Sequence, residues 1–558
     1  MQKSAVTAID TQSYVVGVDV GTGSARAAVF DLAGVRRALA VRPIQMWKPY
    51  AEFAEQSSDD IWHAVGSAVR QAVAEAGVSP SQVHGIGYAA TCSLVVLDGQ
   101  DCPLSVSPEG DNARNIIVWM DHRAIEEAEQ ISRGSYEPLK YVGGAISPEM
   151  QLPKLLWLKR HLPQTFAAAG RFLDLADFLG FQSTGSPVRS ECTTVCKWTY
   201  LGHEQRWDEG FFQAIGLPEF PDPRIGLAHD IKPLGTLAGR LTHKAAAHLG
   251  LIMGTPVAVG AIDAHAGGIG LLGAAWDTGA PPSADQLASV LAVIGGTSTC
   301  HMAASQEPHF IPGVWGPYYG AMVPGLWLTE GGQSASGALL DFVIDTHPAL
   351  PELDALAAQS GQTRYQILNA RIAALAGEAG LAYPALLSRD LHLLDYHLGN
   401  RSPFADPRAR GVVDGLTLDV SLDSLAVLYL AAVQSIAYGT RAIMETLRQS
   451  GYRIRRLLVT GGGVKNPLWL QQHADACDMP LTLTQEPEAV LLGAAILGAA
   501  ACGAYADTPT AMQSMTHPGS SILPDTQAKA YHDAKYQCYQ SLYRDQQTRR
   551  RRMGGFAG

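Results

Sequence analysis

The chain has 558 residues, which is too long for a single hydrophobic core and predicts two or more domains. Hydrophobic residues make up 47% and charged residues 17%, and the formal net charge of −11 argues against nucleic acid or an anionic membrane as a main partner. Eight cysteines are too few for a disulfide scaffold and the N-terminus lacks a signal-peptide pattern, so we expect a cytoplasmic protein.

The first predicted elements are two strands joined by a glycine-rich turn. Residues 14–20 ("YVVGVDV") predict the first strand, and the second ends near Asp31. The Gly-Thr-Gly-Ser turn between them can offer backbone N–H groups and hydroxyls to a phosphate, although a plain hairpin is the alternative. It is neither a Walker loop nor a dinucleotide fingerprint, because it has no Gly-Lys-Ser/Thr and Arg26 stands in the place of the third glycine. Asp19, at the end of the strand, either holds Mg²⁺ through water or caps the turn.

Alternating helical and strand patterns follow, and one buried strand leads into Asp263. "TPVAVGAI" predicts this strand, which we expect to end at Asp263 in a glycine-rich turn. A carboxylate at the end of a buried strand is costly unless something uses it, so Asp263 is a candidate functional residue, with a helix N-cap as the alternative. Gly267 and Gly268 would let the next helix begin close to bound phosphates. His265 is more typical of a hydrogen-bonded core histidine than of a second base.

The strand–glycine turn–strand plan occurs a second time. After a segment rich in Pro, Ala and Asp (274–289), residues 290–305 predict a strand, a Gly-Gly-Thr-Ser turn and another strand. Two such copies predict two similar α/β domains that face each other across a cleft. We assign residues 1–272 to the N-terminal domain and residues 290–558 to the C-terminal domain.

The C-terminal part contains further glycine-rich and helical segments. Residues 457–481 place three glycines before a helix that begins near Asn466, and residues 329–342 form a similar glycine-then-helix segment. Such a segment leaves room for a planar nucleotide base to lie against the backbone. The alternative is a loop in which glycine serves flexibility alone. The stretch "AVLLGAAILGAAACGA" is shorter than a membrane span and predicts a buried helix packed closely on a neighbour. The last fifty residues predict a helix laid on the second domain, with the basic run 549–552 as a solvated tail.

Six motifs together identify a resemblance. They are "GVDVGTGSAR", "WMDHRA", "GAIDAHAGG", "GGTST", "EGGQSASG" and "LLVTGGGVKNPLWLQQHADACDMPL". In these motifs and their order, which span residues 15–545, the sequence resembles the FGGY family of carbohydrate kinases. The resemblance implies the actin-like (ribonuclease H-like) ATPase fold, an α/β fold of two domains with a cleft between them. Within the family, "TCSLVVLD" (91–98) is most similar to pentulose kinases of the D-ribulokinase type.

The resemblance implies ATP-dependent phosphorylation of D-ribulose to D-ribulose 5-phosphate, with Asp263 as general base and Mg²⁺ near Asp19. L-ribulose, D-xylulose and ribitol are alternative substrates; an actin-like ATPase and a non-catalytic sugar-binding regulator are alternatives of another class. ATP and a sugar are the implied partners, and a homodimer is left open. The residues that match the family's ATP site are Gly21, Thr22, Ser24, Arg26, Gly296, Thr297, Gly332, Gln333, Gly462, Gly463 and Asn466. The residues that match its sugar site are Thr91, Cys92, Ser93, Asp121, Glu149, Lys197 and Asp263.

One position departs from the D-ribulokinase pattern. Such sequences usually carry an aspartate just before the Thr-Cys-Ser loop, where this chain has Ala89 and Ala90. Because neither alanine can hydrogen-bond through its side chain, either a sugar contact or a support of the loop is missing. Glu149 and Lys197 have ordinary surface charges as their alternative, and Trp119 is expected in the core.

Overall fold

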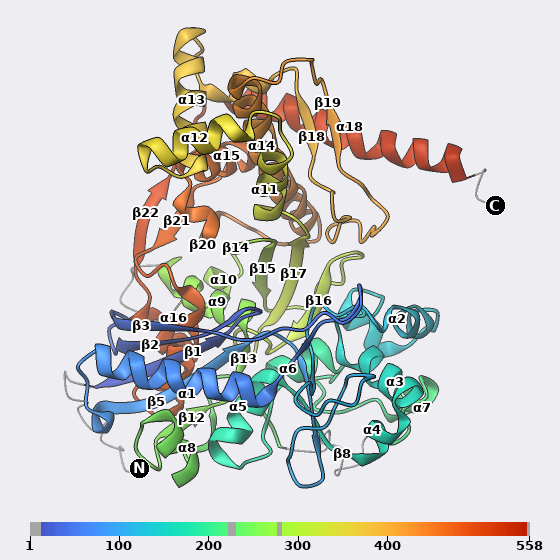
Figure 1. Ribbon diagram of the computed structural model, residues 1–558, viewed down its shortest axis with the longest axis vertical. Helices are drawn as coiled ribbons and strands as arrows, with labels where there is room; N and C mark the ends of the chain where they lie inside the picture. The colour runs from blue at the N-terminus through green and yellow to red at the C-terminus, as the bar shows by residue number, and fades with distance from the viewer. Residues whose placement is uncertain (1–12, 221–229, 276–281, 555–558) are drawn as a thin grey trace.

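The computed structural model describes residues 13–220, 230–275 and 282–554. The N-terminal residues that lack a signal-peptide pattern (1–12) and part of the segment between the predicted domains (276–281) lie outside the described residues. Two α/β halves lie one above the other (Figure 1), and each is built on a seven-stranded sheet.

The N-terminal sheet has the order β11-β12-β5-β1-β2-β3, and β13 also pairs with β5. β1 runs antiparallel to β2 and parallel to β5, so the predicted first hairpin is confirmed. The strands are β1 (Tyr14–Val20), β2 (Ser24–Asp31), β3 (Arg36–Pro43), β5 (Val83–Ala90), β11 (Leu237–Arg240), β12 (Pro256–Ala258) and β13 (Ala261–Ile262).

The C-terminal sheet repeats this plan, with β17-β15-β14-β20-β21-β22 in place of β3-β2-β1-β5-β12-β11, and adds β16 at one edge. The directions also agree, since β14 runs antiparallel to β15 and parallel to β20. The duplicated α/β fold is therefore confirmed. Its strands are β14 (Val290–Gly295), β15 (Thr299–Ser305), β16 (Trp315–Tyr319), β17 (Trp327–Gln333), β20 (Arg456–Gly461), β21 (Leu481–Thr484) and β22 (Pro518–Ile522).

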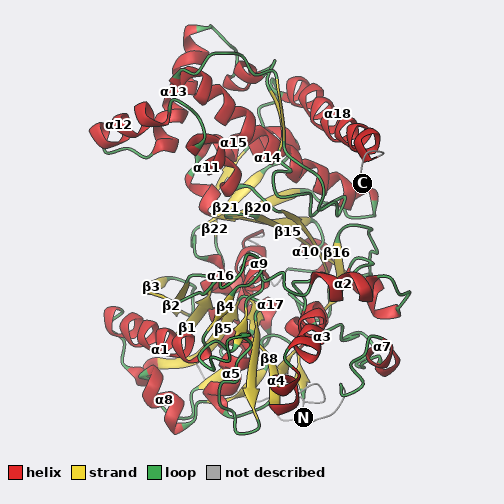
Figure 2. Cartoon of the chain, turned by 45° about the vertical axis from the view of Figure 1, so that its right-hand side comes forward, coloured by secondary structure: helices red, strands yellow, loops and turns green. Residues whose placement is uncertain are grey.

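Helices cover both faces of each sheet (Figure 2). In the N-terminal half, α1 (Ser58–Glu75), α5 (Leu175–Thr184) and α8 (His243–Leu249) lie on one face, and α9 (Asp263–Leu272) and α16 (Ala489–Ala501) on the other. In the C-terminal half, α14 (Leu422–Gln449) contacts α11 (Gly337–Asp345), α13 (Arg364–Glu378) and α15 (Pro467–Cys477). The remaining α-helices of the described residues are α2 (Ile125–Ser132), α3 (Gln151–His161), α4 (Pro163–Ala168), α6 (Glu191–Lys197), α7 (Glu209–Ala214), α10 (Ala284–Leu287), α12 (Leu350–Ser360), α17 (Thr508–Met515) and α18 (Lys529–Gly554).

In the part of the chain that the structure describes, three smaller sheets accompany the two large ones. Their strands are β4 (Glu55–Gln56), β6 (Leu94–Asp98), β7 (Ile116–Ile117), β8 (Ala169–Asp174), β9 (Arg189–Ser190), β10 (Ile231–Lys232), β18 (His392–Leu394) and β19 (Val412–Asp414).

α16 is the predicted buried apolar helix, and it packs very closely on α9. A Cβ added at Gly493 of α16 would come 1.8 Å from the carbonyl oxygen of Ala266, and one added at Gly270 would come 2.0 Å from that of Ala489. α16 belongs to the second half by sequence, yet it packs on β1 and β5 of the N-terminal sheet. α16 also packs on α9, which contacts β14 and β20 of the C-terminal sheet, so the two helices join the two halves.

Local geometry differs from the sequence expectation around Asp263. The expected strand is split into β12 and β13, and Asp263 is the first residue of α9 instead of part of a glycine-rich turn. The two following glycines serve helix packing: a Cβ at Gly267 would come 2.8 Å from Ile294, and one at Gly268 would come 2.3 Å from Met322. Close packing of α9 against the C-terminal half thus fixes the place of Asp263.

The two longest helices of the C-terminal half are α18 and α14. α18 continues through the basic run 549–552, which is therefore helical rather than a tail, and Arg550 pairs with Asp406. Among the described residues, α14 has the length and hydropathy of a membrane span, but 72% of that window is buried inside the protein, as in a core helix.

Candidate active site

A cavity of about 320 Å³ lies between the two halves, where the two glycine turns approach each other. The predicted site residues that line it are Asp19, Gly21, Thr22, Arg26, Thr91, Cys92, Glu149, Lys197, Asp263, Gly296 and Thr297. Trp119, His265, Ser298, Cys300, Trp315, Glu330 and Arg401 line it as well. The structure thus brings together most residues that the motifs single out.

Asp263 is half-buried in the wall of this cavity. The N-cap of α9 is Ile262, so the alternative of Asp263 as an N-cap is wrong. The backbone N–H of Ala264 donates to Asp263 Oδ1 at 2.7 Å, whereas Oδ2 has no partner among the described residues. Burial raises the pKa of Asp263 to about 6, and the charge of Asp19 adds to the rise. Asp263 is therefore mostly ionised at neutral pH, with one oxygen available to accept a proton.

Asp19 and Arg26 are paired across the first hairpin. Arg26 Nε donates to Asp19 Oδ2 at 3.0 Å, and Arg26 Nη1 donates to Glu488 Oε2 at 2.7 Å. Asp19 Oδ1 is buried without a hydrogen-bond partner, and burial raises the pKa of Asp19 despite the charge of Arg26. A buried carboxylate oxygen with no donor fits a hydrated divalent cation such as Mg²⁺. The described residues contain no group of three His, Cys, Asp or Glu side chains for a metal, so water and phosphate oxygens would complete the coordination.

The second glycine turn is the meeting point of three glycine-rich segments. Gly461, at the end of β20, pairs with Gly295, and a Cβ added there would come 2.2 Å from the carbonyl oxygen of Gly295. Gly337, at the start of α11, donates its N–H to the carbonyl oxygen of Gly296 at 3.0 Å. Only backbone without side chains can approach this closely, which explains the glycines in each motif.

Six predicted ATP-site residues do not line the cavity. The Gln333 amide donates to Asp395 and to the backbone carbonyl of Ile436, so it joins β17 to α14. Asn466 caps α15, where its side chain accepts from two backbone N–H groups. Nucleotide contacts of these residues stay predictions. The six residues are Ser24, Gly332, Gln333, Gly462, Gly463 and Asn466.

The Thr-Cys-Ser loop joins the first glycine turn through Trp119. The hydroxyls of Thr91 and Ser93 lie 3.0 Å apart, and Ser93 Oγ accepts the backbone N–H of Trp119 at 3.2 Å. Trp119 Nε1 donates to Thr22 Oγ1 at 3.0 Å. The expectation of a core tryptophan is therefore wrong: Trp119 is half-buried and lines the cavity.

Asp121 lies beneath this loop instead of lining the cavity. It is fully buried, receives the backbone N–H of Ala54 at 2.7 Å and pairs with Arg123 at 2.7 Å. Its carboxylate is therefore engaged by the protein, and its predicted sugar contact stays a prediction.

Charged and aromatic side chains line the opposite part of the cavity. Glu149 lies 3.5 Å from Arg401 Nη2 and 4.0 Å from His122. Burial alone would raise the pKa of Glu149, but the nearby His122 and the charges of Arg401 and Lys197 lower it to about 2. Lys197 and Arg401 both lie over the ring of Trp315, at 5.4 and 5.0 Å. Glu149 and Lys197 are therefore part of the cavity and not ordinary surface charges.

Sequence reasoning missed several residues of this cavity. Arg401 comes from a loop, and a Cβ at Gly332 would come 2.6 Å from Arg401 Cδ, so that glycine makes room for it. The run "GNRSP", a basic residue among turn formers, could have indicated Arg401. His265 is buried as expected, 3.1 Å from Cys192 Sγ and 3.4 Å from Glu330 Oε2. Glu330 stands immediately before the glycines of the "EGGQSASG" motif, where it could have been singled out.

Comparisons with known proteins agree with this geometry. Residues 14–270 match the N-terminal domain, and residues 291–502 the C-terminal domain, of the FGGY family of carbohydrate kinases. An FGGY carbohydrate kinase domain-containing protein of Homo sapiens is 47% identical over 540 residues, which cover 96% of this chain and 97% of the relative. A D-ribulokinase of Saccharomyces cerevisiae is 40% identical over 529 residues, covering 90% of this chain and 74% of the relative.

The fold is shared with solved structures of lower sequence similarity. The xylulose kinase from Rhodospirillum rubrum superposes with a TM-score of 0.76 at 23% identity, covering 95% of this chain and 98% of that one. The matches to both domains of a carbohydrate kinase family favour a sugar kinase over the two alternatives of another class, an actin-like ATPase without a sugar substrate and a non-catalytic regulator. The chain belongs to the FGGY family of carbohydrate kinases and is a sugar kinase, which transfers phosphate to a hydroxyl group.

Proposed function

We propose that this kinase phosphorylates D-ribulose at its 5-hydroxyl, with ATP as donor and Asp263 as general base. The observation that carries the chemistry is the position of Asp263, which has a free carboxylate oxygen in a cavity lined by both glycine turns. The similarity to a yeast D-ribulokinase, and to a ribulokinase of Mycolicibacterium smegmatis at 33% identity over 558 residues, supports a pentulose as substrate.

In the proposed reaction the two turns hold the phosphates and Asp263 activates the sugar. Backbone N–H groups of the turns bind phosphate oxygens, and Arg26 holds the Asp19 carboxylate beside the first turn. Asp263 Oδ2 accepts the proton of the 5-hydroxyl while that oxygen forms its bond to the γ-phosphorus. The bond between the γ-phosphorus and the bridging oxygen breaks, and ADP leaves. Asp19 would hold Mg²⁺, which neutralises phosphate charge in the transition state.

The polar residues around Trp315 support selection among sugars. Glu149 accepts hydrogen bonds, Lys197 and Arg401 donate them, and each hydroxyl left unpaired in a closed site costs about 1–3 kcal/mol. At the position that departs from the D-ribulokinase pattern, Ala89 is fully buried directly beside Asp19 in the β1–β5 ladder. A further carboxylate there would repel Asp19.

A substrate panel tests the proposal. We expect kcat/KM for D-ribulose to exceed that for L-ribulose, D-xylulose, ribitol and glycerol by about tenfold or more, measured by ADP release. Phosphorus NMR of the product would locate the phosphate on carbon 5. A higher kcat/KM for D-xylulose or glycerol would overturn the substrate and leave the kinase assignment intact.

A further inference from the structure

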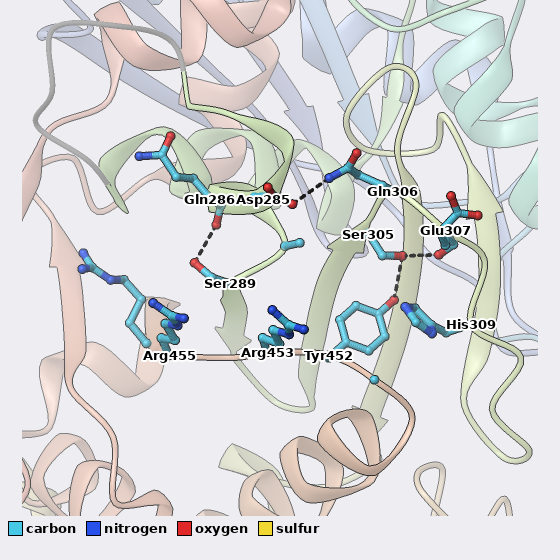
Figure 3. Close-up of a pocket in the computed structure, with 13 residues that line it drawn as sticks. Asp285, Gln286, Ser289, Ser305, Gln306, Glu307, His309, Tyr452, Arg453 and Arg455 are labelled. Atoms are coloured by element: carbon cyan, nitrogen blue, oxygen red, sulfur yellow. Dashed lines mark hydrogen bonds between the residues drawn. The ribbon is translucent and has the colours of Figure 1, made fainter.

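A second cavity, of about 780 Å³, lies in the C-terminal half away from the sugar site (Figure 3). β14 and β20 are paired in parallel from Val290 and Arg456 to Gly295 and Gly461. The second cavity is at the amino ends of these strands, whereas the glycine turns are at their carboxyl ends, roughly 17 Å away at the usual rise per residue. None of its lining residues lines the sugar-kinase cavity.

The floor of this cavity is an extended segment rich in arginine. Arg453 and Arg455 are exposed and alternate with the buried side chains of Tyr452 and Ile454. In an extended segment, residues two apart point to the same side, so both guanidinium groups are on the cavity side (Figure 3). Their side chains make no hydrogen bond or ion pair with any residue that the structure describes. Arg456 also lines the cavity.

Ser305, His309 and Tyr452 also line the cavity and are held in place by contacts within the protein. The Tyr452 hydroxyl donates to Thr329 Oγ1 at 2.8 Å and lies 3.2 Å from Ser305 Oγ. The ring of His309 packs on Tyr452 with the ring centres 4.6 Å apart. These contacts hold this part of the cavity in place, whereas the side chains of Arg453 and Arg455 have no partner among the described residues.

Two carboxylates, Asp285 and Glu307, also line the cavity. Asp285 accepts a hydrogen bond from Gln306 Nε2 at 2.7 Å, and neither carboxylate forms an ion pair with Arg453 or Arg455. Three arginines thus exceed two carboxylates, in a chain whose overall charge is −11. The cavity is a locally cationic site on an anionic protein.

We propose that this cavity binds a phosphorylated small metabolite through Arg453 and Arg455. Guanidinium groups bind phosphate oxygens with paired hydrogen bonds, and two of them side by side suit a ligand with at least two negative charges. The volume is in the range of small-molecule sites. Bringing like charges together destabilises the free protein, and a bound dianion removes that cost. This site is independent of the sugar substrate proposed above.

Inorganic pyrophosphate is the probe for this site, titrated into the full-length protein by calorimetry without divalent cations. We expect R453Q/R455Q to lose one class of pyrophosphate site, or to bind it at least about tenfold more weakly than wild type. The matched control is R549Q/R552Q, which removes the same charge from exposed positions on α18 and should bind as wild type does. Equal affinity in all three proteins would overturn the proposal.

Two further measurements distinguish this site from the glycine turns and phosphate from carboxylate ligands. Pyrophosphate bound at the glycine turns should persist in both variants, so only binding that R453Q/R455Q loses and the control keeps counts as support. Succinate should bind wild type at least about tenfold more weakly than pyrophosphate, and equal or tighter succinate binding would overturn the phosphate assignment. If the double variant is unstable, the single variant Arg453→Gln replaces it, and its melting temperature checks that it is folded. Wild-type pyrophosphate affinity in this single variant would likewise count against the site.

Discussion

The two hairpins that carry the glycine turns share a backbone but differ in their side chains. In the first hairpin, Asp19 pairs with Arg26 on the neighbouring strand. The corresponding position at the end of β14 is Ile294, which pairs with Cys300. An ion pair with a spare carboxylate oxygen in one copy is thus replaced by an apolar side chain and a thiol in the other.

This difference shows which part of the duplicated fold carries which task. Both copies present backbone N–H groups at a glycine turn, which suffices to bind phosphate. The charged groups to which we assign roles in catalysis, Asp19, Arg26 and Asp263, line the cavity from the N-terminal half alone. Duplication of a fold therefore does not duplicate the site, because function depends on particular side chains placed on it.

The largest expected effect comes from removing the carboxylate that we propose as the general base. Asp263→Asn keeps the shape of the side chain but cannot accept the proton, so we expect kcat to fall about 10²–10⁴-fold with ATP and sugar binding largely kept. Asp390→Asn, which removes an exposed carboxylate far from the cavity, is the control and should turn over normally. Wild-type turnover in Asp263→Asn would show that another group accepts the proton.

The comparison of the hairpins is tested most directly by matched substitutions at the equivalent positions. Asp19→Asn should lower kcat about 10²-fold and raise the Mg²⁺ concentration needed, because the buried carboxylate oxygen is lost. Ile294→Asn places the same amide in the second hairpin and should cost less than about tenfold. Similar losses in both variants would mean that the charge at Asp19 has no special part in the reaction.

Features of the fold and the site that depend on residues close together in the sequence could be predicted, whereas those that depend on residues far apart could not. The hairpin at Asp19 and the capped helix at Asn466 follow from local patterns of apolar residues, glycine and proline, and both are present. The packing of α16 on the N-terminal sheet could not be read locally, because it depends on glycines as distant as Gly17, whose added Cβ would come 2.0 Å from the Leu491 carbonyl oxygen. Arg401 reaches the cavity only through the tertiary fold.

The same limit explains why some site residues were placed differently from expectation. Gln333 follows a glycine motif, but its environment is set by Asp395 and Ile436, which lie far along the chain. Trp119 looks like any core tryptophan in sequence, and its role at the cavity comes from the contact with Thr22. Motifs locate a site, whereas the partners of each side chain are a property of the whole fold.

The raised pKa of Asp263 predicts an acid limb in the rate. In the proposed mechanism the ionised form of Asp263 accepts the proton, so kcat/KM should fall as pH drops through about 6, by about tenfold per unit below it. The raised pKa of Asp19 acts in the same direction, since its protonation also removes a required charge. We would measure kcat/KM from about pH 3.5 to 8 alongside circular dichroism. A midpoint near the ordinary aspartate value of about 4 would contradict the buried, charge-coupled site.

The smallest expected effect distinguishes the threonines of the two turns. Thr22 Oγ1 accepts the Trp119 indole N–H, whereas the hydroxyl of Thr297 has no partner among the described residues and is exposed. Thr22→Val leaves that indole N–H without its acceptor, so we expect a loss of stability of about 1 kcal/mol as well as a higher KM for ATP. Thr297→Val removes only a hydroxyl that can reach phosphate, so KM for ATP should rise about two- to fivefold with unchanged stability. Urea unfolding and initial-rate kinetics on both variants measure the two quantities separately. Equal destabilisation by both substitutions would show that the turns are supported alike, and that the hairpins differ only at their charged pair.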